Sequence, residues 1–197
     1  MSDRVKSILL AGVGGQGVLV ASDILSEVAA RSGLDVKKSE VHGVAQRGGS
    51  VVSHTRFGER VFSPLGRMGD IDVLLAFEKL EALRYGHWVR NDGTLIVNDQ
   101  KIMPTLFASE TRGYPEEAIE FLKKKFPSVV VVQAHQIARE LGNLRVISAV
   151  MCGALSTFLD FKQDIWHAVI SESVPPQSLE ANLSAFAKGQ ASTRHSN

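Results

Sequence analysis

KSILLAGVGGQGVLVASDILSEVAARSG, from Lys6 to Gly33, is the stretch that decides the fold of this chain. A short apolar run leads into glycines with the spacing G-x-G-x-x-G, and apolar residues then recur at helical spacing as far as Gly33. Glycine commonly follows the last residue of a helix, because it tolerates the left-handed backbone found there. The stretch therefore predicts a strand, a tight turn and a helix.

The glycine loop between the predicted strand and helix has the context of a phosphate-binding turn. Glycines at positions 12, 14 and 17 let the backbone turn tightly and approach an anion, and the helix N-terminus supplies unpaired N–H donors. The alternative is a strand-to-helix turn that binds nothing. A dinucleotide site would also need an acidic residue near the end of the second strand, and Glu40 lies about there. The charged, glycine-rich segment 42–50 counts against that site, because ordinary dinucleotide-binding domains do not need one.

Strand-like and helix-like segments alternate along the rest of the chain. The pattern predicts strands at residues 34–40, 50–57, 61–63, 71–77, 94–98 and 129–133, and helices at residues 78–88, 115–126, 146–159 and 175–189. Small residues in the helix at 146–159 should let a neighbouring element approach closely, and a turn is expected at 91–93. The alternation indicates a single α/β domain with a mostly parallel sheet and helices on both faces.

We assign residues 1–189 to that domain and residues 190–197 to a disordered tail. The boundary rests on Gly189, which is expected to end the last helix.

Composition excludes several classes of function. The chain has 197 residues and a formal net charge of +1, and its lysines and arginines form no basic field, so we expect no nucleic-acid or anionic-membrane partner. No apolar run approaches the roughly 18 residues of a membrane span, and the N-terminal segment does not resemble a secretory signal, so a cytoplasmic location is expected. Cys152 is the only cysteine, so this chain alone cannot ligate a four-cysteine iron–sulfur cluster. Its apolar surroundings indicate an inert core residue.

Segment 38–58 concentrates polar and charged side chains. His42 and His54 lack companions at metal-ligand spacing, so we predict no metal site, and strand alternation places His54 on the exposed side of its strand. The R-G-G sequence at 47–49 can present a guanidinium and backbone N–H groups to one anion, a phosphate or a carboxylate. A flexible turn with a solvated arginine is the alternative.

Two motifs together resemble a known family. Residues 12–17, GVGGQG, and residues 40–51, EVHGVAQRGGSV, are similar to those of the gamma-type domain family of 2-oxoacid:ferredoxin oxidoreductases, and the similarity covers nearly the whole chain. The portion from His42 to Gln46 resembles the indolepyruvate branch more than the relatives that use pyruvate or 2-oxoglutarate. Val44 stands where methionine is more usual, which leaves the preferred 2-oxoacid open.

The resemblance implies a Rossmann-like subunit of a complex that oxidatively decarboxylates an arylpyruvate to an acyl-CoA and reduces ferredoxin. Thiamine diphosphate, iron–sulfur clusters and coenzyme A would serve that complex mainly on a larger partner subunit. The isolated chain would be inactive, with a homo-oligomer as one form that it can take. Two alternatives stay open: the gamma subunit of a pyruvate, 2-oxoglutarate or branched-chain 2-oxoacid enzyme, and a stand-alone NAD- or FAD-binding protein.

An anion-binding site is expected at the carboxyl ends of the first strands. Its expected occupant is a phosphate of coenzyme A or the carboxylate of the substrate, and no residue of this chain is expected to be catalytic or to bind a metal. The residues expected to bind the cofactor are Gly12, Gly14, Gly15, Gln16, Gly17, Arg47, Gly48, Gly49 and Ser50. Those expected to face the substrate or the partner are Glu40, His42 and Gln46.

Overall fold

One mixed sheet forms the centre of the molecule. The computed structural model describes residues 4–42, 49–103 and 114–193, and within them six strands pair in the order β2-β3-β1-β4-β5-β6. The strands are β1 (Lys6–Val13), β2 (Asp35–His42), β3 (Ser50–Gly58), β4 (Ile71–Ala76), β5 (Val89–Asn98) and β6 (Ser128–Val132). β1, β4, β5 and β6 run parallel, whereas β3 is antiparallel to both of its neighbours, β1 and β2. The predicted mostly parallel sheet is confirmed.

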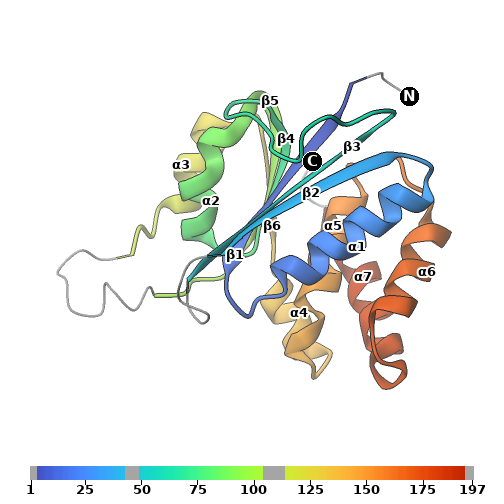
Figure 1. Ribbon diagram of the computed structural model, residues 1–197. Coiled ribbons are helices and arrows are strands. Elements are labelled where there is room, and N and C mark those ends of the chain that lie inside the picture. Colours follow the sequence, from blue (N-terminus) through green and yellow to red (C-terminus); the bar gives the residue numbers. More distant parts are fainter. Residues whose placement is uncertain (1–3, 43–48, 104–113, 194–197) are drawn as a thin grey trace.

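Helices cover both faces of this sheet, as predicted (Figure 1). α2 (Lys79–Tyr85) and α3 (Ala118–Lys125) lie on one face, and α1 (Val18–Arg31), α4 (Ala134–Glu140), α5 (Ile147–Ser156), α6 (Gln163–Ser173) and α7 (Leu179–Thr193) lie on the other. Short 3-10 turns in the described residues, η1 (Gly86–Trp88), η3 (Leu144–Val146) and η4 (Pro176–Ser178), precede β5, α5 and α7. The sequence pattern did not predict α4 or α6. None of the described helices is long and apolar enough to cross a membrane.

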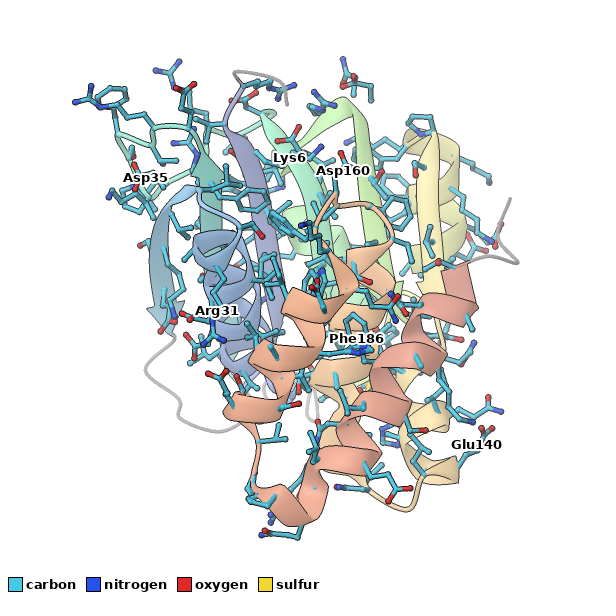
Figure 2. The ribbon with its side chains drawn as sticks, turned by 90° about the vertical axis from the view of Figure 1, so that its right-hand side faces the viewer. Lys6, Arg31, Asp35, Glu140, Asp160 and Phe186 are labelled. Carbon is cyan, nitrogen blue, oxygen red and sulfur yellow. The ribbon has the colours of Figure 1, made fainter. Side chains whose placement is uncertain are left out.

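The close approach predicted for the helix at 146–159 is confirmed. Every residue of α5 is buried. A Cβ atom added to Gly153 would lie 2.0 Å from the carbonyl oxygen of Phe186, and one added to Gly189 would lie 2.0 Å from that of Val150. α5 and α7 therefore cross with their backbones in contact, and Figure 2 shows Phe186 inside the helical layer that they build.

The crossing also corrects the predicted end of the last helix. Gly189 does not stop α7, which continues to Thr193. Glycine stands there because the α5 backbone leaves no room for a side chain, and not because the helix needs a left-handed cap. Residues 190–193 consequently belong to the helix, and the remainder of the predicted tail, 194–197, lies outside the described residues.

Two other local predictions were wrong. Residues 61–63 form no strand, because β1 and β2 already occupy both edges of β3 and leave it no further edge to pair with. Residues 91–93 form no separate turn but belong to β5, whose pairing with β4 shifts register between Ile71 and Val73. This shift in register lets the strand include the turn-forming residues Asn91, Asp92 and Gly93 without ending.

His54 is buried rather than exposed, which corrects the predicted role of this side chain. Only 5% of its surface is accessible, because Trp88 packs edge-on against the imidazole with ring centres 5.3 Å apart and the loop after β3 covers the same face. The Gly66 N–H lies 3.4 Å from Nδ1. Burial, with a smaller contribution from Arg56, lowers the pKa of His54, so the imidazole is a neutral core group.

Candidate functional site

The glycine loop after β1 is shaped by both packing and backbone geometry. A Cβ atom on Gly12 would lie 2.7 Å from Val18 Cγ2 and 2.8 Å from Phe77 Cβ. Gly15 and Gly17 have φ angles of +97° and +85°, in the left-handed region that favours glycine. Gly17 is also the N-cap of α1, so this helix begins without a capping side chain, and its first turn contains no acidic residue. The first N–H groups of α1 are therefore available to an anion.

Gln16 holds the loop in place. Its Oε1 accepts a hydrogen bond from the Val13 N–H (2.7 Å), and its Nε2 donates to the Phe77 carbonyl (2.9 Å) and to Gln100 Oε1 (3.0 Å). The oxygen and the nitrogen of this amide are thus both hydrogen-bonded, to residues at or just after the ends of β1, β4 and β5. Gln16 lies at the predicted site, but its hydrogen bonds serve the loop itself.

A cavity of about 300 Å³ opens beside the glycine loop. Its walls come from the start of α1, from η3 and the start of α5, and from the start of α7, which Figure 1 shows gathered at the lower end of the molecule where β1 ends. The lining residues are Gly15, Gln16, Gly17, Val20, Asn143, Leu144, Arg145, Ile147, Ser148, Val174, Pro175, Ser178 and Asn182. Among these described lining residues, none carries a negative charge, and Arg145 carries a positive one.

Sequence reasoning missed the walls contributed by the C-terminal half. Asn143 and Arg145 precede a helix, and Asn143 Oδ1 accepts the Arg145 N–H (3.0 Å) as an N-cap does. Ser148 follows as the second residue of α5. A capping asparagine and an isolated serine at the head of an apolar helix are the only sequence signals of these walls, and neither indicates contact with a loop some 130 positions earlier.

Gly49, the residue directly before β3, lies beside the glycine loop. Gly49 accepts a hydrogen bond on its carbonyl from the Gly14 N–H (2.9 Å). Gln46, Arg47 and Gly48 lie outside the described residues. His42 ends β2, and its side chain is likewise outside the described part of the chain.

Ser50 points away from the cavity, toward α2. Its Oγ donates to Glu81 Oε2 (2.6 Å) and lies 3.3 Å from the Tyr85 hydroxyl. Glu81 is 3% exposed and also pairs with Arg84 (2.9 Å). Burial raises the pKa of Glu81, although the hydrogen bond from Ser50 and the charge of Arg84 oppose the rise. Ser50 therefore belongs to a second polar cluster, on the opposite face of the sheet.

Glu78 is the centre of that second cluster. This carboxylate is 1% exposed and accepts the backbone N–H groups of Leu80 (2.6 Å), Glu81 (3.1 Å) and Ile102 (3.1 Å) as well as the Tyr114 hydroxyl. Two of these bonds cap the N-terminus of α2. The cluster is fully occupied by partners within the chain.

Glu40 does not occupy the position that a dinucleotide site requires. Its carboxylate pairs with Lys38 Nζ (2.7 Å) on β2. Because β3 lies between β1 and β2, Glu40 is two strand spacings, roughly 10 Å, from the strand that carries the glycine loop. In the dinucleotide fingerprint these two strands are adjacent. The strand order therefore disfavours a stand-alone NAD or FAD site.

Cys152 is a core residue, as predicted. It is fully buried, and burial raises the pKa of its thiol to about 12, so this side chain is suited neither to ligate iron nor to act as a nucleophile. In residues 4–42, 49–103 and 114–193, no group of three or more histidine, cysteine, aspartate and glutamate side chains could hold a metal ion.

Comparison with known proteins identifies relatives along nearly the whole chain. Residues 7–192 match the family model "Pyruvate ferredoxin/flavodoxin oxidoreductase". The chain is 38% identical to the "Indolepyruvate oxidoreductase subunit IorB" of Archaeoglobus fulgidus, covering 93% of this chain and 92% of that protein. It is 36% identical to the protein of the same name from Thermococcus kodakarensis, with 93% of each covered. The "Pyruvate/ketoisovalerate oxidoreductases common subunit gamma" of Pyrococcus furiosus is 29% identical over 74% of this chain and 73% of its own length.

Solved structures share the fold. The gamma subunit of a keto/oxoacid ferredoxin oxidoreductase from Geobacter sulfurreducens PCA superposes with a TM-score of 0.70 at 21% identity, covering 96% of this chain and 98% of that one. A 2-oxoglutarate:ferredoxin oxidoreductase from Magnetococcus marinus superposes with a TM-score of 0.76 at 20% identity, and this chain matches 32% of its length. The resemblance based on the glycine loop and on segment 40–51 is thus confirmed. The chain belongs to the pyruvate ferredoxin/flavodoxin oxidoreductase family.

Proposed function

We propose that the chain is the small subunit of a 2-oxoacid:ferredoxin oxidoreductase that acts on arylpyruvates such as indolepyruvate. The observation that carries the proposal is the contrast between two sets of relatives. Four indolepyruvate oxidoreductase subunits are 34–38% identical over 93% of the chain, whereas the pyruvate/ketoisovalerate gamma subunits are 28–30% identical over 74%. The reaction would convert the 2-oxoacid and coenzyme A to acyl-CoA and carbon dioxide, with two electrons passed to ferredoxin.

The cofactors divide between this chain and a larger partner subunit. Thiamine diphosphate and iron–sulfur clusters would supply the decarboxylation and electron-transfer chemistry on the partner, because the one cysteine of this chain is buried with a raised thiol pKa. The role proposed for this chain is to provide an anion-binding site. Support comes from the uncapped start of α1, from the glycines at 15 and 17, and from a cavity in which Arg145 is the one charged residue among the described lining.

The proposed occupant is a phosphate of coenzyme A or the carboxylate of the 2-oxoacid. Arg47, Gly48 and Gly49 remain part of this proposal, because Gly49 lies hydrogen-bonded to Gly14 in the glycine loop. Glu40, His42 and Gln46 would face the substrate or the partner subunit from the same edge. A cytoplasmic location also belongs to the proposal, and cell fractionation would test it.

The substrate assignment is tested on the assembled complex. The chain is co-expressed with a candidate thiamine- and cluster-bearing subunit, and turnover is followed with coenzyme A and a ferredoxin-type acceptor. Indolepyruvate and phenylpyruvate are expected to have kcat/KM at least about tenfold above pyruvate, 2-oxoglutarate and ketoisovalerate. A preference for one of those smaller 2-oxoacids would move the chain to the alternative branch. The isolated chain should show no turnover and no micromolar binding of NADH.

The role of Arg47 is tested by Arg47→Ala in the same complex. Loss of one charged hydrogen bond should lower kcat/KM for coenzyme A or for the 2-oxoacid by about 10- to 100-fold, corresponding to about 1.5–3 kcal/mol. Lys124→Ala, which removes an exposed charge from α3 on the other face of the sheet, is the control. Unchanged kinetics in an intact Arg47→Ala complex would remove this residue from the site.

A further inference from the structure

A second cavity lies at the opposite end of the sheet from the glycine loop. It has a volume of about 150 Å³, and its walls come from the start of β1, the end of β3 and the loop that joins α5 to α6. No described residue lines both this cavity and the one beside the glycine loop. The length of β1, roughly 23 Å from its first residue to its last, separates the two. A ligand here would therefore occupy a site of its own.

The interior of this cavity is apolar and largely aromatic. The uncharged side chains that line it are Leu34, Phe57, Phe158, Leu159 and Phe161. The ring centres of Phe57 and Phe161 lie 5.2 Å apart, and the Phe161 ring lies 6.3 Å from that of Trp166 in the core. An apolar space of about 150 Å³ is large enough for a benzene ring. The cavity therefore fits one phenyl group.

Two lining side chains of opposite charge, Lys6 and Asp160, form no ion pair with each other or with any other described residue. Lys6 is paired with Phe57 in the register of β1 and β3, which places both side chains on the same face of the sheet. Asp160 is exposed on the loop after α5, and Figure 2 shows it beside Lys6 at this end of the molecule. Arg4 also lines the cavity, but its guanidinium pairs with carboxylates outside it, at 3.2 and 3.3 Å.

This pair of charges favours a ligand that carries both signs. A simple anion would be attracted by Lys6 and repelled by Asp160, and a simple cation would meet the reverse. A zwitterion places a negative group near Lys6 and a positive group near Asp160. In an α-amino acid both groups are attached to the same carbon atom, and an aromatic side chain on that carbon can enter the apolar interior.

We propose that this cavity binds a free α-amino acid with an aromatic side chain. The ring occupies the apolar interior, the carboxylate pairs with Lys6, and the ammonium group pairs with Asp160. An arylpyruvate has an oxo group where the amino acid has an ammonium group, so Asp160 favours the amino acid over the 2-oxoacid. The proposal goes beyond the proposed function and does not rest on it, because the site needs neither the glycine loop nor the partner subunit.

The test measures amino acid binding to the full isolated chain by calorimetry and by NMR of backbone amides. L-Phenylalanine should bind with a Kd below about 1 mM and shift the signals of residues 4–6, 57–58 and 158–161. Three analogues each remove one group: phenylpyruvate the ammonium, phenethylamine the carboxylate and L-alanine the ring. The first two should bind about three- to tenfold more weakly, and L-alanine at least about tenfold more weakly.

Two variants assign one charge of the ligand to each side chain. Asp160→Asn should weaken L-phenylalanine binding by about three- to tenfold and leave phenylpyruvate unchanged, so that the two ligands bind alike. Lys6→Gln should do the same for L-phenylalanine and phenethylamine. Glu117→Gln, which removes an exposed carboxylate at the start of α3 on the other face of the sheet, is the control and should change nothing. Asp160 is exposed and forms no ion pair with any described residue, so its variant is expected to fold normally.

Several results would overturn this site. They are no binding of L-phenylalanine at 10 mM or about that concentration, equal affinity for L-phenylalanine and phenylpyruvate in the wild type, and unchanged L-phenylalanine affinity in Asp160→Asn. Signal shifts at residues 15–20 and 143–148 instead of those around the cavity would also overturn it. Such results together with arylpyruvate turnover by the complex would leave the proposed function standing. Selective binding of L-phenylalanine without arylpyruvate turnover would support the site and overturn the proposed function.

Discussion

The two faces of the sheet differ at the carboxyl ends of its strands. On the α2 face, the Glu78 carboxylate accepts four donors and the Glu81 carboxylate accepts Ser50. On the α1 face, the Ser148 hydroxyl and the start of α1 present donors that no described residue accepts. The two carboxylates on the α2 face thus find their donors within the chain, whereas the Ser148 hydroxyl and the first N–H groups of α1 have no acceptor among the described residues. Burial of polar groups indicates a binding site only where their partners are missing.

The largest effect on stability is expected from Glu78→Ala. The substitution removes the acceptor of four donors, including the two N–H groups that it caps in α2. The free energy of unfolding should fall by about 3 kcal/mol, and urea denaturation measures it. Tyr114→Phe removes one of the four donors and should cost only about 1 kcal/mol. Equal losses for the two variants would contradict a cluster centred on Glu78.

An intermediate effect with a defined pH dependence is expected from Glu81→Gln. Burial raises the pKa of Glu81 above its ordinary value of 4.5, so between those two values the folded protein binds more protons than the unfolded chain. This group therefore favours folding most at low pH, and its contribution is lost as pH rises through the raised pKa. Glutamine does not titrate, so the variant gains stability relative to wild type as pH rises above 4.5, by about 1 kcal/mol or less.

Urea denaturation of both proteins at several pH values measures that difference. Glu78 and Arg84 are the charges nearest to Glu81 and are unchanged in the variant. A difference in stability that is constant with pH would show that the titration of Glu81 is not perturbed.

The smallest effect on stability is expected on the α1 face. Ser148→Ala removes a hydroxyl that has no partner in the described chain, so the free energy of unfolding of the ligand-free protein should change by less than about 0.5 kcal/mol or rise. Ser22 is the matched control, because its buried hydroxyl lies 2.6 Å from Ser53 Oγ and 3.2 Å from Thr55 Oγ1. Ser22→Ala should cost about 1–2 kcal/mol. A comparable loss in Ser148→Ala would mean that its hydroxyl is already satisfied, and the contrast between the two faces would fail.

Elements that depend on residues close together in the sequence could be predicted. Contacts between segments far apart in the sequence could not. The glycine loop, α1 and β4 follow from spacing and apolar runs within a few residues. The antiparallel insertion of β3 between β1 and β2 does not, because strand order is decided by pairings between remote segments. Gly189 was misread for the same reason: its local pattern fits a helix end, and only contact with Val150 on α5 explains it.

The same distinction between local and long-range signals applies to the residues of the candidate site. Gly15 and Gly17 line the cavity as their spacing suggests, since the requirement for a left-handed backbone is local. Ser50 follows the glycines of its own motif, yet its side chain is taken by Glu81 on the other face. Ser148 meets Gly17 only in the folded chain, 131 positions away, so no short motif could have joined them.

The contact between α5 and α7 limits how far the walls of the cavity beside the glycine loop can move apart. Ser148 is five residues before Gly153, and Asn182 is seven before Gly189, so both cavity walls begin roughly 8–10 Å from the point where the helices touch. Helices in backbone contact at one point have little freedom to separate so close to it. Attempts to fit a bulkier molecule should therefore start at positions 153 and 189, which lie outside the cavity lining but determine how far apart its walls stand.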